Sequence, residues 1–222
     1  MPSFADILSR FSVLVGAPAA FGVTLTAGLL LIGRDWRLSI AALAAQYALA
    51  VVLFAQVIPP QVSGVKLLVG LLSCLILLLS AQQAQAGWRR PLGATVDTPG
   101  EPLNLLAVRG SILPAGLTFR LPAALIVGLA AWAVAGQPGG RLPDVSAAVT
   151  QAVFALGGMS LLVIALSEAP LQIGLGLLTF LTGLELFYHA VEPSLSVIAL
   201  LAMAHFGIAV VTGYVTIVEA GR

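Results

Sequence analysis

Seven long apolar stretches, separated by short polar or proline- and glycine-rich breaks, run through almost the whole chain. They cover residues 11–33, 38–58, 64–82, 117–136, 146–166, 170–191 and 194–218. A helix that crosses a bilayer needs about 20 predominantly apolar residues, and in lipid its backbone must satisfy its own hydrogen bonds. The pattern therefore predicts an all-α integral membrane protein with about seven transmembrane helices.

The breaks between these stretches have the chemistry of helix ends and loops. Residues 34–37 form a charged turn, and Pro59-Pro60 cannot continue a helix. The long connection 83–116 is expected to be cytoplasmic, with a candidate interfacial helix near its end. The predicted organisation has three parts: a three-helix unit over 1–82, the long loop with the fourth helix over 83–144, and a second three-helix unit over 145–222.

Composition supports a membrane protein and narrows its partners. The chain is 59% apolar and 9% charged, with a mean hydropathy of +1.07, whereas soluble domains carry about 25% charged residues. A net charge of +1 leaves no basic patch for a nucleic acid, so the lipid bilayer is the expected surrounding. The single cysteine, Cys74, cannot form an internal disulfide, and no metal-ligand or cofactor motif is present. We expect no cofactor, and Cys74 is interpreted as a packing residue.

The arginines and lysines predict the orientation. Seven of them fall on one side of the predicted helices and three on the other: Arg34, Arg37, Arg89, Arg90, Arg109, Arg120 and Arg222 against Arg10, Lys66 and Arg141. Cytoplasmic loops carry the excess of basic residues. This predicts a multi-pass protein of the cell inner membrane, with its N-terminus outside and its C-terminus in the cytoplasm.

A shift of 133 residues superposes parts of the two three-helix units. Phe54 then falls on Phe187, and Pro60 falls on Pro193. The coincidences suggest a parallel three-helix repeat, in which helices 1–3 and 5–7 are copies joined by helix 4. The copies differ at one important position, because Val52 stands opposite Glu185.

Glu185 is the most informative residue of the chain. It is the one carboxylate in the otherwise apolar stretch 171–187, and burying it in a membrane costs on the order of 3 kcal/mol. Thr182, Glu185, His189 and Glu192 follow one another at spacings of 3, 4 and 3, which places them on one helix face. Such a row could pass protons without bulk water. The alternatives are a structural hydrogen bond for Glu185 and an interfacial position for the other two ionisable groups.

Three residues on other helices are candidates to join Glu185. Lys66 lies at the same estimated depth, so an ion pair is expected, with an interfacial anchor as the alternative. His205 lies in the middle of its helix and could relay protons or make a structural hydrogen bond. Gln46 is a further polar candidate, although such residues often hold helices together. Thr182 and Gln46 would give polar support to the relay.

The motif Gly183-Leu184-Glu185 resembles one in subunit K of respiratory complex I and in its counterpart in multisubunit cation/proton antiporters. In that family, a Gly-Leu-Glu motif places a buried glutamate in the second helix. The resemblance implies that Glu185 is that glutamate. The family's third helix carries another buried carboxylate, and His205 stands at the corresponding position here.

The whole chain resembles hydrogenase-4 component E, a larger relative of that family. Arg37-Leu38-Ser39, Gln46 and Lys66 match motifs of its front part. The resemblance implies a non-redox subunit of a proton- or cation-translocating complex. Its expected partners are larger antiporter-like membrane subunits and a peripheral redox or other soluble module. The chain has no catalytic motif of its own.

Two other functions compete with this one. The first is a stand-alone small transporter, which a parallel repeat would permit. The second is a structural or pigment-holding subunit of a photosynthetic or respiratory assembly, with His189 or His205 as an axial ligand. The proteins that copurify with the chain, or pigment in the purified protein, would separate these alternatives.

Overall fold

The computed structural model describes residues 16–33, 35–88, 117–143, 145–191 and 194–221, and this part of the chain is helical with short turns. Its helices are α2 (Ala17–Ile32), α3 (Trp36–Phe54), α4 (Pro60–Trp88), α5 (Leu117–Gly136), α6 (Ala147–Leu166), α7 (Pro170–Val191) and α8 (Leu195–Ala220). All except α2, which has 16 residues, are long and apolar enough to cross a membrane. The predicted all-α class and the seven helices are therefore confirmed within the described residues.

Two predicted boundaries are wrong, each for a local reason. The third helix was expected to end at residue 82, but α4 continues to Trp88, because residues 82–87 contain no helix breaker before the last of them. The first predicted unit therefore ends inside α4. The second helix was expected to reach residue 58, but α3 ends at Phe54. The Pro59-Pro60 pair disfavours helical backbone just before it, and a turn fills the gap. The candidate helix 105–112 lies outside the described residues.

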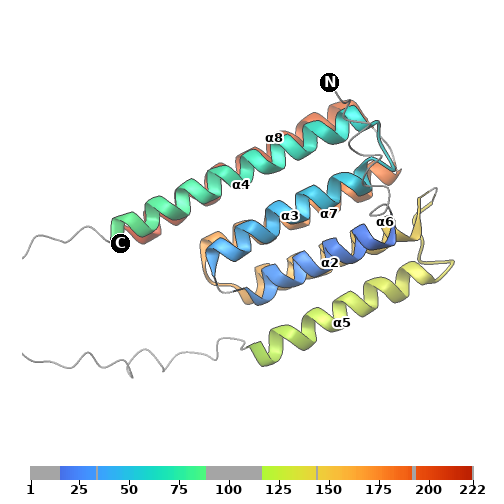
Figure 1. Cartoon of the computed structure of the whole chain (residues 1–222), viewed down its shortest axis with the longest axis horizontal. Helices are drawn as coiled ribbons and strands as arrows, with labels where there is room; N and C mark the ends of the chain where they lie inside the picture. The colour runs from blue at the N-terminus through green and yellow to red at the C-terminus, as the bar shows by residue number, and fades with distance from the viewer. Residues whose placement is uncertain (1–15, 34, 89–116, 144, 192–193, 222) are drawn as a thin grey trace, which may run out of the picture.

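The helices form two layers of three (Figure 1). One layer contains α2, α3 and α4, and the other contains α6, α7 and α8. Each helix of the first layer packs against its counterpart in the second, so α2 meets α6, α3 meets α7 and α4 meets α8. The helices of each pair run in the same direction, and α5 packs outside the layers against α6 and α2.

The bundle has two ends, which we name by the prolines at which helices begin. The Pro60 end is where α4 begins and α7 ends, and the Pro170 end, opposite to it, is where α7 begins. At the Pro170 end, α4 and α8 extend past the other helices (Figure 1). Their 29 and 26 residues correspond to lengths of about 44 and 39 Å, more than the roughly 30 Å of a hydrocarbon core.

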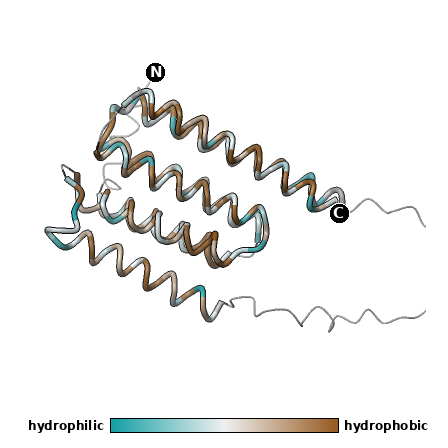
Figure 2. Tube along the Cα trace, turned by 180° about the vertical axis from the view of Figure 1, so that it is seen from behind, coloured by the Kyte–Doolittle hydropathy of each residue, from teal (hydrophilic) through white to brown (hydrophobic). Residues whose placement is uncertain are grey.

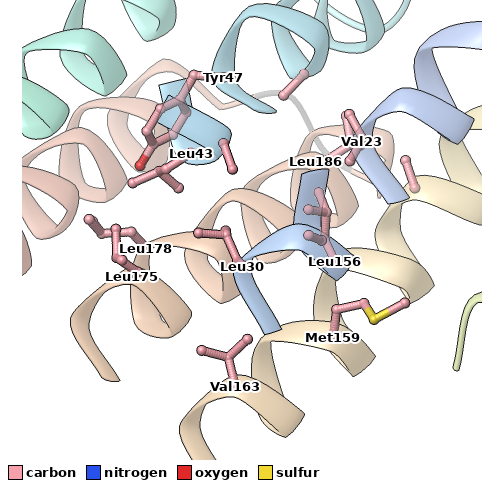
Figure 3. Close-up of a cluster of buried hydrophobic side chains, with 14 of the residues drawn as sticks. Val23, Leu30, Leu43, Tyr47, Leu156, Met159, Val163, Leu175, Leu178 and Leu186 are labelled. Carbon is pink, nitrogen blue, oxygen red and sulfur yellow. The ribbon is translucent and has the colours of Figure 1, made fainter. Parts of the chain in front are cut away.

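Apolar residues fill the space between the layers and also cover the outside. Leu30, Leu43, Leu156 and Leu178 are almost completely buried in the core (Figure 3). Hydrophobic residues recur along every helix, whereas hydrophilic ones gather at helix ends and turns (Figure 2). Met203 is 74% exposed, and many other apolar side chains of α4, α5 and α8 lie on the surface. A surface of this kind suits lipid as the surrounding medium.

Arg120, near the start of α5, ties the Pro170 ends of two other helices together. Its guanidinium group donates one hydrogen bond to the carbonyl of Leu31 in α2 at 3.1 Å and another to the carbonyl of Leu166 in α6 at 2.5 Å. Carbonyls in the last turn of a helix have no partner within the helix, and cations are favoured there. A residue counted in the sequence only for its charge is therefore also a clamp between the two layers.

Candidate functional site

The predicted ion pair between Lys66 and Glu185 is confirmed. The Lys66 Nζ atom lies 2.9 Å from Glu185 Oε2, and the two residues are only 8% and 4% exposed. Lys66 is six residues into α4, and Glu185 is six residues before the end of α7. Both helix ends lie at the Pro60 end, so a rise of 1.5 Å per residue puts both charges about 9 Å inside their helices. The pair joins one helix of each layer.

His205 of α8 completes a three-residue cluster with them. Its Nδ1 atom lies 3.3 Å from Glu185 Oε1, and its Nε2 atom lies 3.4 Å from Thr182 Oγ1. The Thr182 hydroxyl already donates to the carbonyl of Leu178 at 2.8 Å, so it accepts from His205. The Nδ1–Oε1 contact needs one proton, which either the ring or the carboxyl group can carry. The arrangement therefore offers two neighbouring positions for a single proton.

A small cavity lies against this cluster, where α3, α4, α7 and α8 meet. Its volume is about 20 Å³, which is enough for about one water molecule. The side chains of Tyr47 and Phe54 line it together with those of the cluster. The Tyr47 ring passes over Gly70 of α4, where a Cβ atom would lie 2.6 Å from the ring. Gly70 therefore permits this position of Tyr47.

Sequence reasoning missed Tyr47, Phe54 and Gly70 as members of the site. Tyrosine and phenylalanine in an apolar helix are ordinary packing residues, so their types carried no signal. Gly70 follows Lys66 by four residues and shares its helix face, which is the one hint the sequence offered.

His189 is buried but does not touch the cluster directly. It is 1% exposed, and neither ring nitrogen has a hydrogen-bond partner among the described residues. Its ring packs edge-on against Phe54, with the centroids 5.7 Å apart. The alternative of an interfacial histidine is therefore wrong for His189. Glu192, the next member of the predicted row, lies outside the described residues.

Gln46 is also buried away from the cluster. It is fully enclosed, and both atoms of its amide group lack a hydrogen-bond partner within the described part of the chain. Thr179 of α7, 1% exposed, likewise has a hydroxyl without such a partner. Buried polar groups are nearly always satisfied by protein or ordered water, because leaving one unpaired costs about 1–3 kcal/mol. The interface between α3 and α7 is therefore a place where internal water would bind.

The described residues contain no group of three or more histidine, cysteine, aspartate or glutamate side chains that could hold a metal ion. The chemistry available to the cluster is the exchange of protons and the pairing of charges. Comparison of the chain with protein-family models, curated proteins and solved structures gives no match. The family resemblance therefore depends on the motifs in the sequence, and the site has to be interpreted from its own geometry.

Proposed function

We propose that the chain is a non-redox membrane subunit of a proton- or cation-translocating complex of the complex I, group 4 hydrogenase and antiporter superfamily. Glu185 is its protonatable relay residue, and Lys66 and His205 are the groups that respond to its charge. The observation that carries the proposal is the buried contact of Glu185 with a lysine on one oxygen and a histidine on the other.

The arrangement suits a relay better than a purely structural role. A lone buried ion pair stabilises a fold poorly, because desolvation offsets much of the attraction between the charges. A third ionisable group on the second carboxylate oxygen is not needed for packing, yet it gives a proton somewhere to go. Moving that proton changes the charge that Lys66 feels across 2.9 Å. Such coupling is strong where water is scarce.

The arrangement of the helices supports the parallel repeat as part of this proposal. Shifting Trp36, the start of α3, by 133 residues gives Ala169, directly before the start of α7. The same shift moves Ile32, the end of α2, to Ala165, one residue before the end of α6. The helices paired by the shift are those that pack against each other and run in the same direction. Gene duplication followed by divergence would produce this pattern.

The proposed topology and partners follow from the same reasoning. Arg37 and Arg120 lie in the first turns of α3 and α5, both at the Pro170 end, which we propose to be cytoplasmic. Larger antiporter-like membrane subunits would then cover part of the apolar outer surface, and a soluble module would bind at the Pro170 end. Purification in a mild detergent tests this, because a copurifying membrane protein with a dozen or more helices is expected. A lone homodimer would favour a stand-alone transporter.

Glu185→Gln is the decisive test of the relay. Glutamine keeps the size and hydrogen-bonding capacity of the side chain but cannot carry an exchangeable charge, and it costs less to desolvate. We expect normal assembly and a loss of ion translocation of at least about tenfold, because a proton-transfer group typically contributes more than that. Glu185→Asp should retain part of the activity, because its carboxylate remains on a shorter side chain.

The measurement is ion pumping into vesicles together with the abundance of the assembled complex. The matched control is Glu168→Gln, which makes the same chemical change at an exposed carboxylate in the turn before α7, at the opposite end of that helix. This control should pump at the wild-type rate. Full pumping by Glu185→Gln at normal abundance would reduce Glu185 to a structural residue and refute the proposal.

A further inference from the structure

Phe54 stands between two ionisable parts of the candidate site. The Lys66 Nζ atom lies over the face of its ring, 5.2 Å from the centroid, and the ring of His189 meets it at a centroid distance of 5.7 Å. Phe54 is 2% exposed and lines the cavity beside Glu185. The row of groups on α7 that could pass protons is therefore interrupted, in space, by an aromatic side chain from α3.

A hydrocarbon ring is a barrier to proton transfer. Protons pass between heavy atoms that are hydrogen-bonded at about 2.7–3.2 Å, and a phenylalanine ring has no atom that can take up or release one. Its π-face nevertheless attracts the Lys66 ammonium group. The same ring can therefore hold Lys66 near Glu185 and keep His189 apart from both.

The backbone at Phe54 is suited to a side chain that moves. Phe54 is the last residue of α3, and the turn from Ala55 to Ile58 follows directly. The shift of 133 residues pairs Phe54 with Phe187. Phe187 is 40% exposed on α7 and takes no part in the cavity. The chain thus supplies a natural control, a phenylalanine at the equivalent position of the other layer.

We propose that Phe54 is a positioning residue that closes the Glu185 cluster toward the Pro60 end, and that its ring must move aside for a proton to pass between His189 and the Lys66–Glu185 pair. This inference rests on the proposed function. It adds a barrier on a defined side of the cluster, which the relay by itself does not require.

The test is passive proton flux through liposomes that contain the full chain, followed with a trapped pH-sensitive dye. Phe54→Ala should raise the flux several-fold, because water can then join His189 to the cluster. Phe54→Leu keeps an apolar side chain in place of the ring, and Phe187→Ala removes a ring outside the cavity, so both should stay near the wild-type rate. The double variant Phe54→Ala/Glu185→Gln should lose the added flux, because the pathway ends at the carboxylate.

Three outcomes would overturn the barrier. An unchanged flux in Phe54→Ala would show that the ring does not limit access. Equal leaks in Phe54→Ala and Phe187→Ala, or a leak that survives Glu185→Gln, would indicate loosened packing. These results are independent of the pumping assay. Loss of pumping in Glu185→Gln with no leak in Phe54→Ala would leave the proposed function standing and remove only the role of Phe54.

Discussion

The two three-helix layers have similar backbones and opposite chemistry at equivalent positions. Glu185 and His205 are buried in the second layer, and the residues 133 positions earlier are Val52 and Leu72. Leu72 is 42% exposed, whereas His205 is 3% exposed. A bundle of paired helices could hold this site twice, but only one of the two places is charged and enclosed, and the other is apolar and more open to the surroundings.

The charges of the enclosed place come from both layers. Lys66 belongs to the first layer, and its equivalent in the second is the exposed Ala199. Neither layer alone could bury its own ionisable groups, because an uncompensated charge in an apolar interior is far more costly than a paired one. The difference between the layers therefore makes each dependent on the other, and single substitutions can test that dependence.

The largest effect should come from removing the cation of the first layer. Lys66→Met leaves the Glu185 carboxylate buried without its lysine, and breaking a buried pair in this way costs about 3–5 kcal/mol. We expect a marked fall in the thermal unfolding temperature in detergent. Adding Glu185→Gln should restore much of the loss, because no charge is then left uncompensated. Equal destabilisation in the single and double variants would show that Lys66 acts through packing alone.

An intermediate effect should come from a glycine of the second layer. Gly183 of α7 faces α6 so closely that a Cβ atom would lie 2.9 Å from Leu156 Cβ, whereas the equivalent residue of α3 is Ala50. Gly183→Ala should cost about 1–3 kcal/mol, as is usual when a packed interface is overfilled. Gly28→Ala is the control, because its Cβ would meet nothing within 4 Å. Equal unfolding temperatures for both variants would contradict the close approach.

The smallest effect, of opposite sign, is expected at Gln46. Its amide has no partner among the described residues, so Gln46→Leu removes polar atoms that are costly to bury. We expect unchanged or slightly higher stability, with a change within about 1 kcal/mol. Thr179→Val, at the equivalent position of α7, should behave the same way. A large loss in either unfolding experiment would mean that these groups hold bound water that the fold requires.

Much of the fold could be predicted because local features of the sequence mark the helices and their ends. The bounds predicted for α5 and α7 coincide with those of the structure, since proline, glycine and polar turns lie at their ends. In α4, by contrast, glutamines and alanines continue the helix past its predicted end, although they are no longer apolar. Hydropathy indicates where lipid would begin, whereas backbone hydrogen bonding decides where a helix stops.

Local sequence was sufficient to find the class of the protein, the unusual carboxylate and the depth of its lysine. A buried charge needs an opposite charge at the same level, and counting residues from the nearest helix breaks locates it. Which side chains lie between these groups could not be found in this way. That His205 reaches the second oxygen of Glu185, and that Phe54 separates His189 from Lys66, depends on how four helices rotate against one another. Helix rotation is set by packing across the whole interface, and no local pattern of residues records it.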